Sequence, residues 1–133
     1  MPKQKPSFEI YTYGIYSKWD RDSKDIPKII KITDRIPAEI DIEFGYLLKI
    51  KRGKGIRLEF KIEHPPFKDD KGKTRPPFTG EHYVNGNDWE FFLGDTIWEP
   101  VSDKIGKWTL STYYEGKVVA KKTLFIEPLI LQH

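Results

Sequence analysis

The sequence contains no cysteine, and this absence excludes three kinds of site at once. A disulfide framework, a thiolate metal centre and a cysteine nucleophile all need that side chain. At 133 residues the chain is predicted to be a single domain, 1–133. A domain of this size buries about two-thirds of its unfolded surface and needs no cross-link. The lack of cysteine also favours a reducing compartment, so we expect a cytoplasmic protein.

Long apolar runs are missing as well. No window approaches the roughly 18 consecutive apolar residues that a membrane helix requires. The first ten residues, MPKQKPSFEI, contain two lysines but no apolar segment behind them, so they do not read as a signal peptide. We therefore expect no membrane association, although a leader removed earlier would leave no trace. Residues 1–6 and 128–133 are expected to be flexible tails.

The sequence also lacks a large excess of positive or negative charge. The chain has 23 Lys and Arg against 20 Asp and Glu, which gives a formal net charge of +3. Nucleic-acid-binding proteins usually concentrate basic residues on one face. The sequence therefore predicts no nucleic-acid partner.

Patterns typical of catalytic and metal sites are absent too. The sequence has three histidines, His64, His82 and His133. No two of them lie in one predicted strand at the spacing that metal ligands usually have. No serine has the glycine-flanked pattern of a nucleophile elbow. The neighbouring carboxylates at 20–22 and 69–70 lie in polar stretches rather than in buried pairs. We predict no catalytic residue, no metal and no cofactor, and hence a protein that is not an enzyme.

What the sequence does have is aromatic residues, turn residues and alternation. Aromatic residues make up 14% of the chain, and ten prolines and ten glycines are spread along it. Apolar residues recur at every second position in short segments bounded by turn signals. This pattern predicts an all-β fold, an immunoglobulin-like antiparallel β-sandwich of about seven strands with little or no helix. A closed barrel is the alternative.

The segment 106–127 is the clearest hairpin. Residues 106–114 alternate, Glu115-Gly116 supplies the turn, and the return strand has an apolar face. We assign Val118 to that face together with residues 120, 124 and 126. Lys122 interrupts it, which indicates either a strand edge or a bulge that shifts the register, and we favour the edge.

Several other strands are expected. They are residues 7–16, the less regular edge or sheet-switching segment 26–36, and residues 40–51, 56–64, 81–84 and 89–93. The segment 40–51 should be central, with one face in the core and the other largely wet. The turn 52–55 would make it an antiparallel neighbour of 56–64 if it closes a hairpin. Residues 67–81 are expected to form a solvated loop, with a basic anion-binding patch as the alternative.

Short sequence elements resemble domain-of-unknown-function family 3859, small bacterial proteins. They comprise Ile36-Pro37, Phe44-Gly45, His64-Pro65, Trp98-Glu99, Gly106-Lys107-Trp108, Glu115-Gly116-Lys117 and Leu124-Phe125-Ile126. The resemblance covers most of residues 36–127. It implies a β-sandwich and supplies no activity, because none is assigned to the family.

Two kinds of function remain. A protein-interaction or structural module would use sandwich edges or outer-face residues, here Tyr11, Tyr13, Ile15 and Leu47, to contact an unknown protein partner or a second copy. A ligand-binding module would stack a glycan or another ring on exposed aromatic side chains. The candidates for that role are Trp19, Tyr83 and Trp89. The alternative for Trp89, Phe92, Trp98 and Trp108 is that they fill the core and its ends. We favour the interaction module.

Overall fold

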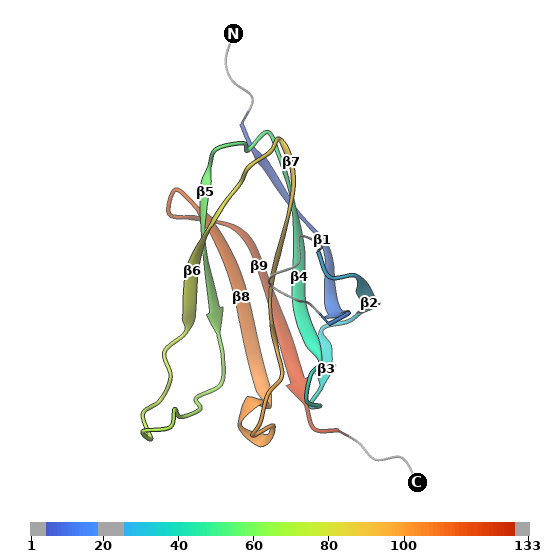
Figure 1. Ribbon diagram of the computed structural model, residues 1–133, viewed down its shortest axis with the longest axis vertical. Helices are drawn as coiled ribbons and strands as arrows, with labels where there is room; N and C mark the ends of the chain where they lie inside the picture. The colour runs from blue at the N-terminus through green and yellow to red at the C-terminus, as the bar shows by residue number, and fades with distance from the viewer. Residues whose placement is uncertain (1–4, 19–25, 130–133) are drawn as a thin grey trace.

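The computed structural model describes residues 5–18 and 26–129. Within these ranges nine strands form two sheets that face each other (Figure 1). The four-stranded sheet has the order β2-β1-β4-β7, with β1 Ser7–Tyr16, β2 Ile29–Ile32, β4 Glu43–Lys51 and β7 Asp88–Thr96. The five-stranded sheet has the order β3-β9-β8-β5-β6, with β3 Arg35–Pro37, β5 Arg57–Glu63, β6 Phe78–Tyr83, β8 Gly106–Tyr114 and β9 Lys117–Glu127.

The predicted all-β sandwich is therefore confirmed. In the described part of the chain the helical structure is one short 3-10 turn, η1 Ser102–Lys104. The strand number exceeds the predicted seven partly because the segment 26–36 divides into β2 and β3. The predicted flexible tails, 1–6 and 128–133, lie outside the described residues except for 5–6 and 128–129. No helix of the described residues is long and apolar enough to cross a membrane.

The core lies between the two sheets. Its largest fully buried side chains include Phe44 and Tyr46 of β4 and Trp108 of β8. The Phe44 and Trp108 rings meet edge to face, with centroids 5.1 Å apart. The Tyr46 hydroxyl lies 2.5 Å from Thr112 Oγ1, which joins the two sheets through a buried hydrogen bond. Burial raises the pKa of Tyr46, and the bond to Thr112 partly offsets this rise.

The β8–β9 hairpin forms as predicted. Glu115 and Gly116 both have positive φ, at 51° and 77°, as a tight two-residue hairpin turn requires. The register shifts after Thr112, which leaves one extra residue in β9 between Val118 and Ala120. The assignment of Val118 to the core face is wrong, because this bulge leaves it 53% exposed.

Lys122 lies where β9 has a free edge in the described structure. β3 pairs with β9 only at residues 125–127. The Lys122 side chain is half-buried, and its Nζ lies 4.0 Å from the centroid of the Tyr13 ring in the opposite sheet. The predicted edge position is confirmed. The cation at this position contacts an aromatic face instead of entering the core.

A bulge also changes the faces of β1. Ile10 pairs with Leu48 while Thr12 pairs with Leu47, so Tyr11 is the extra residue. The inward side of β1 is consequently Phe8 and Ile10 before the bulge, and Tyr13 and Ile15 after it. The predicted outer-face contact surface is therefore wrong for Tyr13 and Ile15. Tyr11 remains 57% exposed, with Lys49 Nζ 3.6 Å from its ring centroid.

Strand β4 is central, as predicted, but its outer face is buried from residue 43 to residue 47 and reaches solvent only toward Lys51. Leu47 is 7% exposed and forms a second apolar cluster with Tyr16 and Phe92, to which Ile26 adds. The expectation of a largely wet outer face is therefore wrong for this part of the strand, because these side chains cover it. Leu47 is consequently not part of an open contact surface.

The turn 52–55 does not close a hairpin. β4 pairs with β1 and β7, whereas β5 pairs with β6 and β8, so the turn carries the chain from one sheet to the other. The turn 84–87 crosses between the same two sheets. The Arg52 backbone N–H donates to Asn87 O at 2.8 Å, and that of Gly55 to Val84 O at 2.7 Å. Backbone N–H groups of the turn 52–55 thus find their hydrogen-bond acceptors in the turn 84–87.

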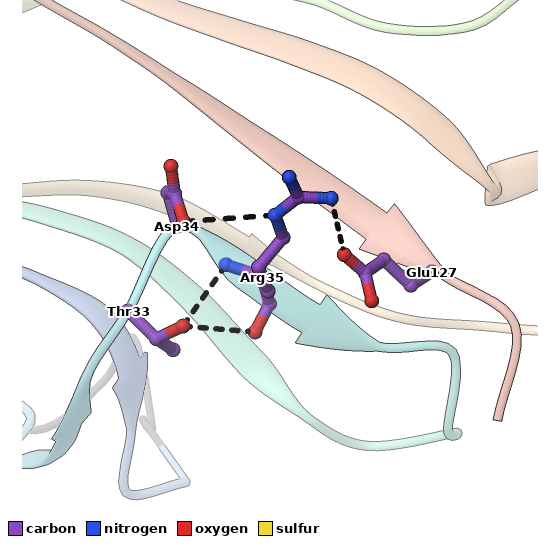
Figure 2. Close-up of polar contacts among 4 residues, drawn as sticks. All are labelled: Thr33, Asp34, Arg35 and Glu127. Carbon is purple, nitrogen blue, oxygen red and sulfur yellow. Dashed lines mark hydrogen bonds and ion pairs between the residues drawn. The ribbon is translucent and has the colours of Figure 1, made fainter. Parts of the chain in front are cut away.

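A third crossing joins β2 to β3, at residues 33–34. Figure 2 shows how it is held: the Arg35 backbone N–H donates to Thr33 Oγ1 at 3.0 Å, and Arg35 Nη1 donates to Glu127 Oε1 at 2.6 Å. β3 then runs parallel to β9. The segment 26–36 is therefore both an edge strand and a sheet switch, the two roles predicted for it.

Candidate binding groove between strands β6 and β7

The two sheets leave one side of the sandwich open. β6 ends the five-stranded sheet, and β7 ends the four-stranded sheet. β6 ends and β7 begins at the crossing 84–87, and away from it the two strands lie increasingly far apart (Figure 1). Among the described residues no strand pairs with the outer edge of either. The outer edges of β6 and β7 therefore both present unpaired backbone N–H and C=O groups on this side of the sandwich.

A groove of about 630 Å³ lies between these edges. Its lining is mostly apolar and comes from β5, β6, β7 and the segments beside them. The lining residues are Phe60, Ile62, Arg75, Phe78, Thr79, Phe91, Phe92, Leu93, Gly94, Asp95 and Trp98. A volume and composition of this kind suit an apolar side chain or small ring with a few polar contacts.

Gly80 of β6 shapes the groove through Phe60. A Cβ built on Gly80 would lie 2.4 Å from Phe60 Cζ. The missing side chain lets the Phe60 ring lie across β6, where it lines the groove and packs at 5.9 Å from the Phe91 ring. This glycine is needed for close approach, not for turn geometry.

An aromatic cluster closes one end of the groove, where β6 begins and β7 ends. Phe67 lies between Trp98, at 5.5 Å, and His64, which stacks on it at 4.1 Å. Phe78 and Trp108 complete the cluster, at 4.7 and 5.8 Å from the His64 ring. Both Phe78 and Trp98 also line the groove, so this cluster fixes one of its walls.

A buried lysine holds the cluster to the turn after β7. Lys104 is 1% exposed, and its Nζ donates to Pro100 O at 2.9 Å and to Asp103 Oδ1 at 2.5 Å. The same Nζ lies 4.5 Å from the Trp98 ring centroid and 4.7 Å from that of Phe67. The ammonium group is therefore satisfied by oxygens and by aromatic faces, and it orients Trp98.

His64 ties the loop between β5 and β6 to its two ends. Its Nδ1 lies 2.7 Å from Pro65 O, and its Nε2 lies 2.9 Å from Pro76 O. The loop itself is built on Asp69, whose Oδ1 accepts from the backbone N–H groups of Lys71 and Lys73. The predicted irregular loop is thus an organised turn with Phe67 buried beneath it, and β6 begins at 78 rather than 81.

Two charged residues lie in the lining of the groove. Asp95 Oδ1 accepts from the Thr96 backbone N–H at 2.8 Å. Arg75 is exposed, and its backbone N–H donates to Phe67 O at 2.8 Å. No acidic side chain of the described residues pairs with its guanidinium. The groove therefore offers one unpaired cation beside its aromatic wall.

The predicted ligand-binding residues do not form one platform. Trp19 lies outside the described residues. Tyr83 is 58% exposed on the outer face of β6, whereas Trp89 of β7 packs against the core. No ring contact joins Tyr83 to Trp89 in the described ranges. Binding at these residues remains a prediction, and the structure separates the two that it describes.

Trp89 instead pairs with His82. Its indole Nε1–H donates to His82 Nε2 at 2.8 Å, so that nitrogen is unprotonated and the imidazole is neutral. Burial lowers the pKa of His82. His82 also stacks on Phe91 at 4.3 Å, which places this pair behind the groove wall. The interpretation as core residues fits Trp108, which is fully buried, and Trp89 and Trp98, which pack at the margin of the core. Phe92 is buried too, but in the second apolar cluster on the other face of the four-stranded sheet.

Sequence reasoning did not assign the groove residues Phe60 and Phe78 to a binding site, and it considered Arg75 only as part of the alternative, a basic anion-binding patch in the loop 67–81. Phe60 reads as one more inward residue of an alternating strand, and only Gly80 across from it signals an unusual approach. Phe78 follows Pro76-Pro77, which obscured the start of β6. Within the described ranges no three His, Asp or Glu side chains lie close enough to hold a metal ion.

Three elements of the family resemblance lie together at the end of this groove that is formed by the aromatic cluster. His64, Trp98 and Trp108 belong to one aromatic cluster, and a Cβ on Gly106 would lie 3.1 Å from Pro65. The sequence model of DUF3859, a domain of unknown function, matches residues 4–126. The chain belongs to the DUF3859 family.

A solved structure supports the fold of this DUF3859 chain. The crystal structure of an immunoglobulin-like protein from Pseudomonas aeruginosa matches it with a TM-score of 0.74 at 18% sequence identity. The match covers 94% of this chain and 98% of that protein. The DUF3859 chain therefore has an immunoglobulin-like sandwich fold. No curated protein matches its sequence.

Proposed function

We propose that this DUF3859 protein is a non-enzymatic interaction module whose groove between β6 and β7 receives an extended segment of a partner protein. The supporting observation is an aromatic-lined groove between two unpaired strand edges. An edge supplies main-chain hydrogen bonds, and pockets beside it select alternate side chains of the added segment. Each large apolar side chain that a partner buries there would contribute about 1.5–3 kcal/mol before the costs of ordering.

The proposal can be tested by photo-crosslinking in the native cell. A photoreactive phenylalanine analogue in place of Phe78, a half-buried residue of the groove lining, should give discrete adducts with another protein. The same analogue at Lys121, exposed on β9 of the five-stranded sheet, is the control and should give none. Equal adducts at both positions, or none at Phe78, would count against the groove.

A second candidate function is glycan binding on the outer face of the five-stranded sheet. A polar hollow of about 600 Å³ is lined there by Glu59, Lys61, Thr79, Glu81 and Tyr113, among others. Arg57 pairs with Glu59 at 3.4 Å and with Glu81 at 3.5 Å, which orients both carboxylates. A ring such as Tyr113 beside fixed carboxylates suits a neutral sugar.

The two candidates predict different responses. Neutral oligosaccharides should raise the thermal midpoint of the wild type and not that of Tyr113→Ala if the hollow binds glycan. No shift with any of a panel of glucan, chitin and xylan oligosaccharides would remove this second candidate. A cytoplasmic location and the lack of a nucleic-acid partner stay predictions, which cell fractionation and binding assays at low salt would test.

A further inference from the structure

We propose that the partner segment pairs with the outer edge of β7 and carries an acidic side chain that binds Arg75. This inference rests on the proposed function and adds to it the strand that is extended and the charge that the partner must have.

The choice of β7 follows from length and from the lining of the groove. β7 has nine residues and β6 has six, so β7 offers the longer unpaired edge. Five consecutive β7 residues, 91–95, line the groove, whereas β6 contributes only Phe78 and Thr79. An extended segment beside β7 would therefore stay over the groove for most of its length.

The alternation of β7 sets the pattern of the partner. Phe91 and Leu93 belong to the core between the sheets, and Phe92 belongs to the apolar cluster on the opposite face. Side chains of a paired strand alternate in register with its neighbour. Every second partner residue would thus enter the groove beside Phe60, Phe78 and Trp98, and those residues should be apolar.

The acidic side chain proposed for the partner segment follows from the position of Arg75. It is the one cation among the residues that line the groove, and the described structure supplies no carboxylate to it. Its backbone is fixed by the bond to Phe67 O and by the Lys68–Thr74 bridge, so the base of the side chain is set in place. A guanidinium beside an apolar wall favours a carboxylate that can pair with it bidentately.

The test begins with selection from a random twelve-residue peptide library against the whole protein. Enriched peptides should alternate apolar residues and share an Asp or Glu at one end. A synthetic peptide of that sequence is then measured by calorimetry. Arg75→Glu should weaken its binding at least tenfold, and a peptide with the acid replaced by Lys should bind Arg75→Glu better than it binds the wild type.

Lys73→Glu is the matched control, because Lys73 is an exposed cation of the same loop outside the groove lining. It should change the affinity less than twofold. Equal losses in both variants, or enriched peptides without an acid, would overturn the inference. N-methylation of alternate peptide amides should abolish binding in one register only, and indifference in both registers would exclude strand pairing.

Failure here is distinguishable from failure of the proposed function. If crosslinking at Phe78 succeeds while the selected peptides need neither an acid nor free amides, the groove still binds a partner, and only the proposed acidic residue and the proposed pairing with β7 are wrong. If crosslinking and selection both fail, the groove itself is not the binding site.

Discussion

At the level of single residues, the hydrogen bond between Tyr46 and Thr112 is a buried polar contact that joins the two sheets inside the core. Tyr46→Phe would remove the hydroxyl and leave Thr112 Oγ1 buried without that partner. We expect a loss of about 1–2 kcal/mol in the free energy of unfolding, measured with urea. Tyr11→Phe is the control, since Tyr11 is exposed, and it should change stability by less than about 0.5 kcal/mol.

The pair of His82 and Trp89 predicts a pH dependence. Burial lowers the pKa of His82 in the folded protein, so below about pH 6.5 the unfolded chain takes up the proton first. Stability conferred by neutral His82 is therefore present above that pH and is lost as the pH falls toward the lowered pKa. His82→Gln, which does not titrate, should lose less stability between pH 7.5 and 5.5 than the wild type. Equal losses in urea midpoint would contradict the assignment.

Single residues also show the limit of sequence reading. Alternation correctly placed Trp108, Tyr46 and Leu48 in the core, because burial in a regular strand follows period two. It did not separate Tyr83 from Trp89, because their faces depend on which sheet each strand joins. Alternation also did not distinguish Arg75 from the other cations of the alternative anion-binding patch in the loop 67–81, because only the folded chain places Arg75 in one groove with Trp98 and Phe78.

At the scale of the element, Gly80 in β6 keeps the Phe60 ring in the groove wall. Gly80→Ala would place a Cβ 2.4 Å from Phe60 Cζ, so the ring must move. We expect a cost of about 1–3 kcal/mol in unfolding free energy and weaker binding of a groove peptide. Adding Phe60→Leu should restore much of the lost stability, and additive losses in the double variant would show that the ring is not the cause.

A substitution in the turn between β8 and β9 should make the protein more stable. Glu115 has a φ of 51°, a left-handed conformation that costs a residue with an ordinary side chain about 1 kcal/mol. Asn tolerates this conformation and is favoured in such turns. Glu115→Asn should therefore raise the unfolding free energy, whereas Lys117→Asn, just outside the turn, should not. An unchanged denaturation midpoint for Glu115→Asn would refute this explanation.

The two-residue turn between β8 and β9 was predicted correctly, whereas the bulges in β1 and β9 were not. The β8–β9 hairpin follows from Glu115-Gly116 alone, because local backbone preference decides a two-residue turn. Bulges at Tyr11 and before Ala120 leave no clear mark in the sequence. Each changes which side chains face the core, so the faces of half of β1 and of Val118 were assigned wrongly.

For the whole molecule, the sandwich and its family could be predicted, while the pairing of strands other than β8 and β9 could not. The turn 52–55 has the composition of a hairpin, yet it crosses between sheets because its backbone groups bond to residues 84–87. That partner lies thirty residues further along the chain, beyond the reach of local rules. The groove exists only because of this crossing, which is why the sequence did not reveal it.

The crossings between the sheets also affect the rate of folding. β1 pairs with β4 and β4 with β7, so each contact of the four-stranded sheet closes a loop of many residues before it gains a hydrogen bond. Such a topology folds on the scale of milliseconds to seconds. The β8–β9 hairpin, whose ends are neighbours in sequence, is the natural nucleus. Destabilising substitutions there should slow refolding in stopped-flow experiments, and those in β7 should chiefly speed unfolding.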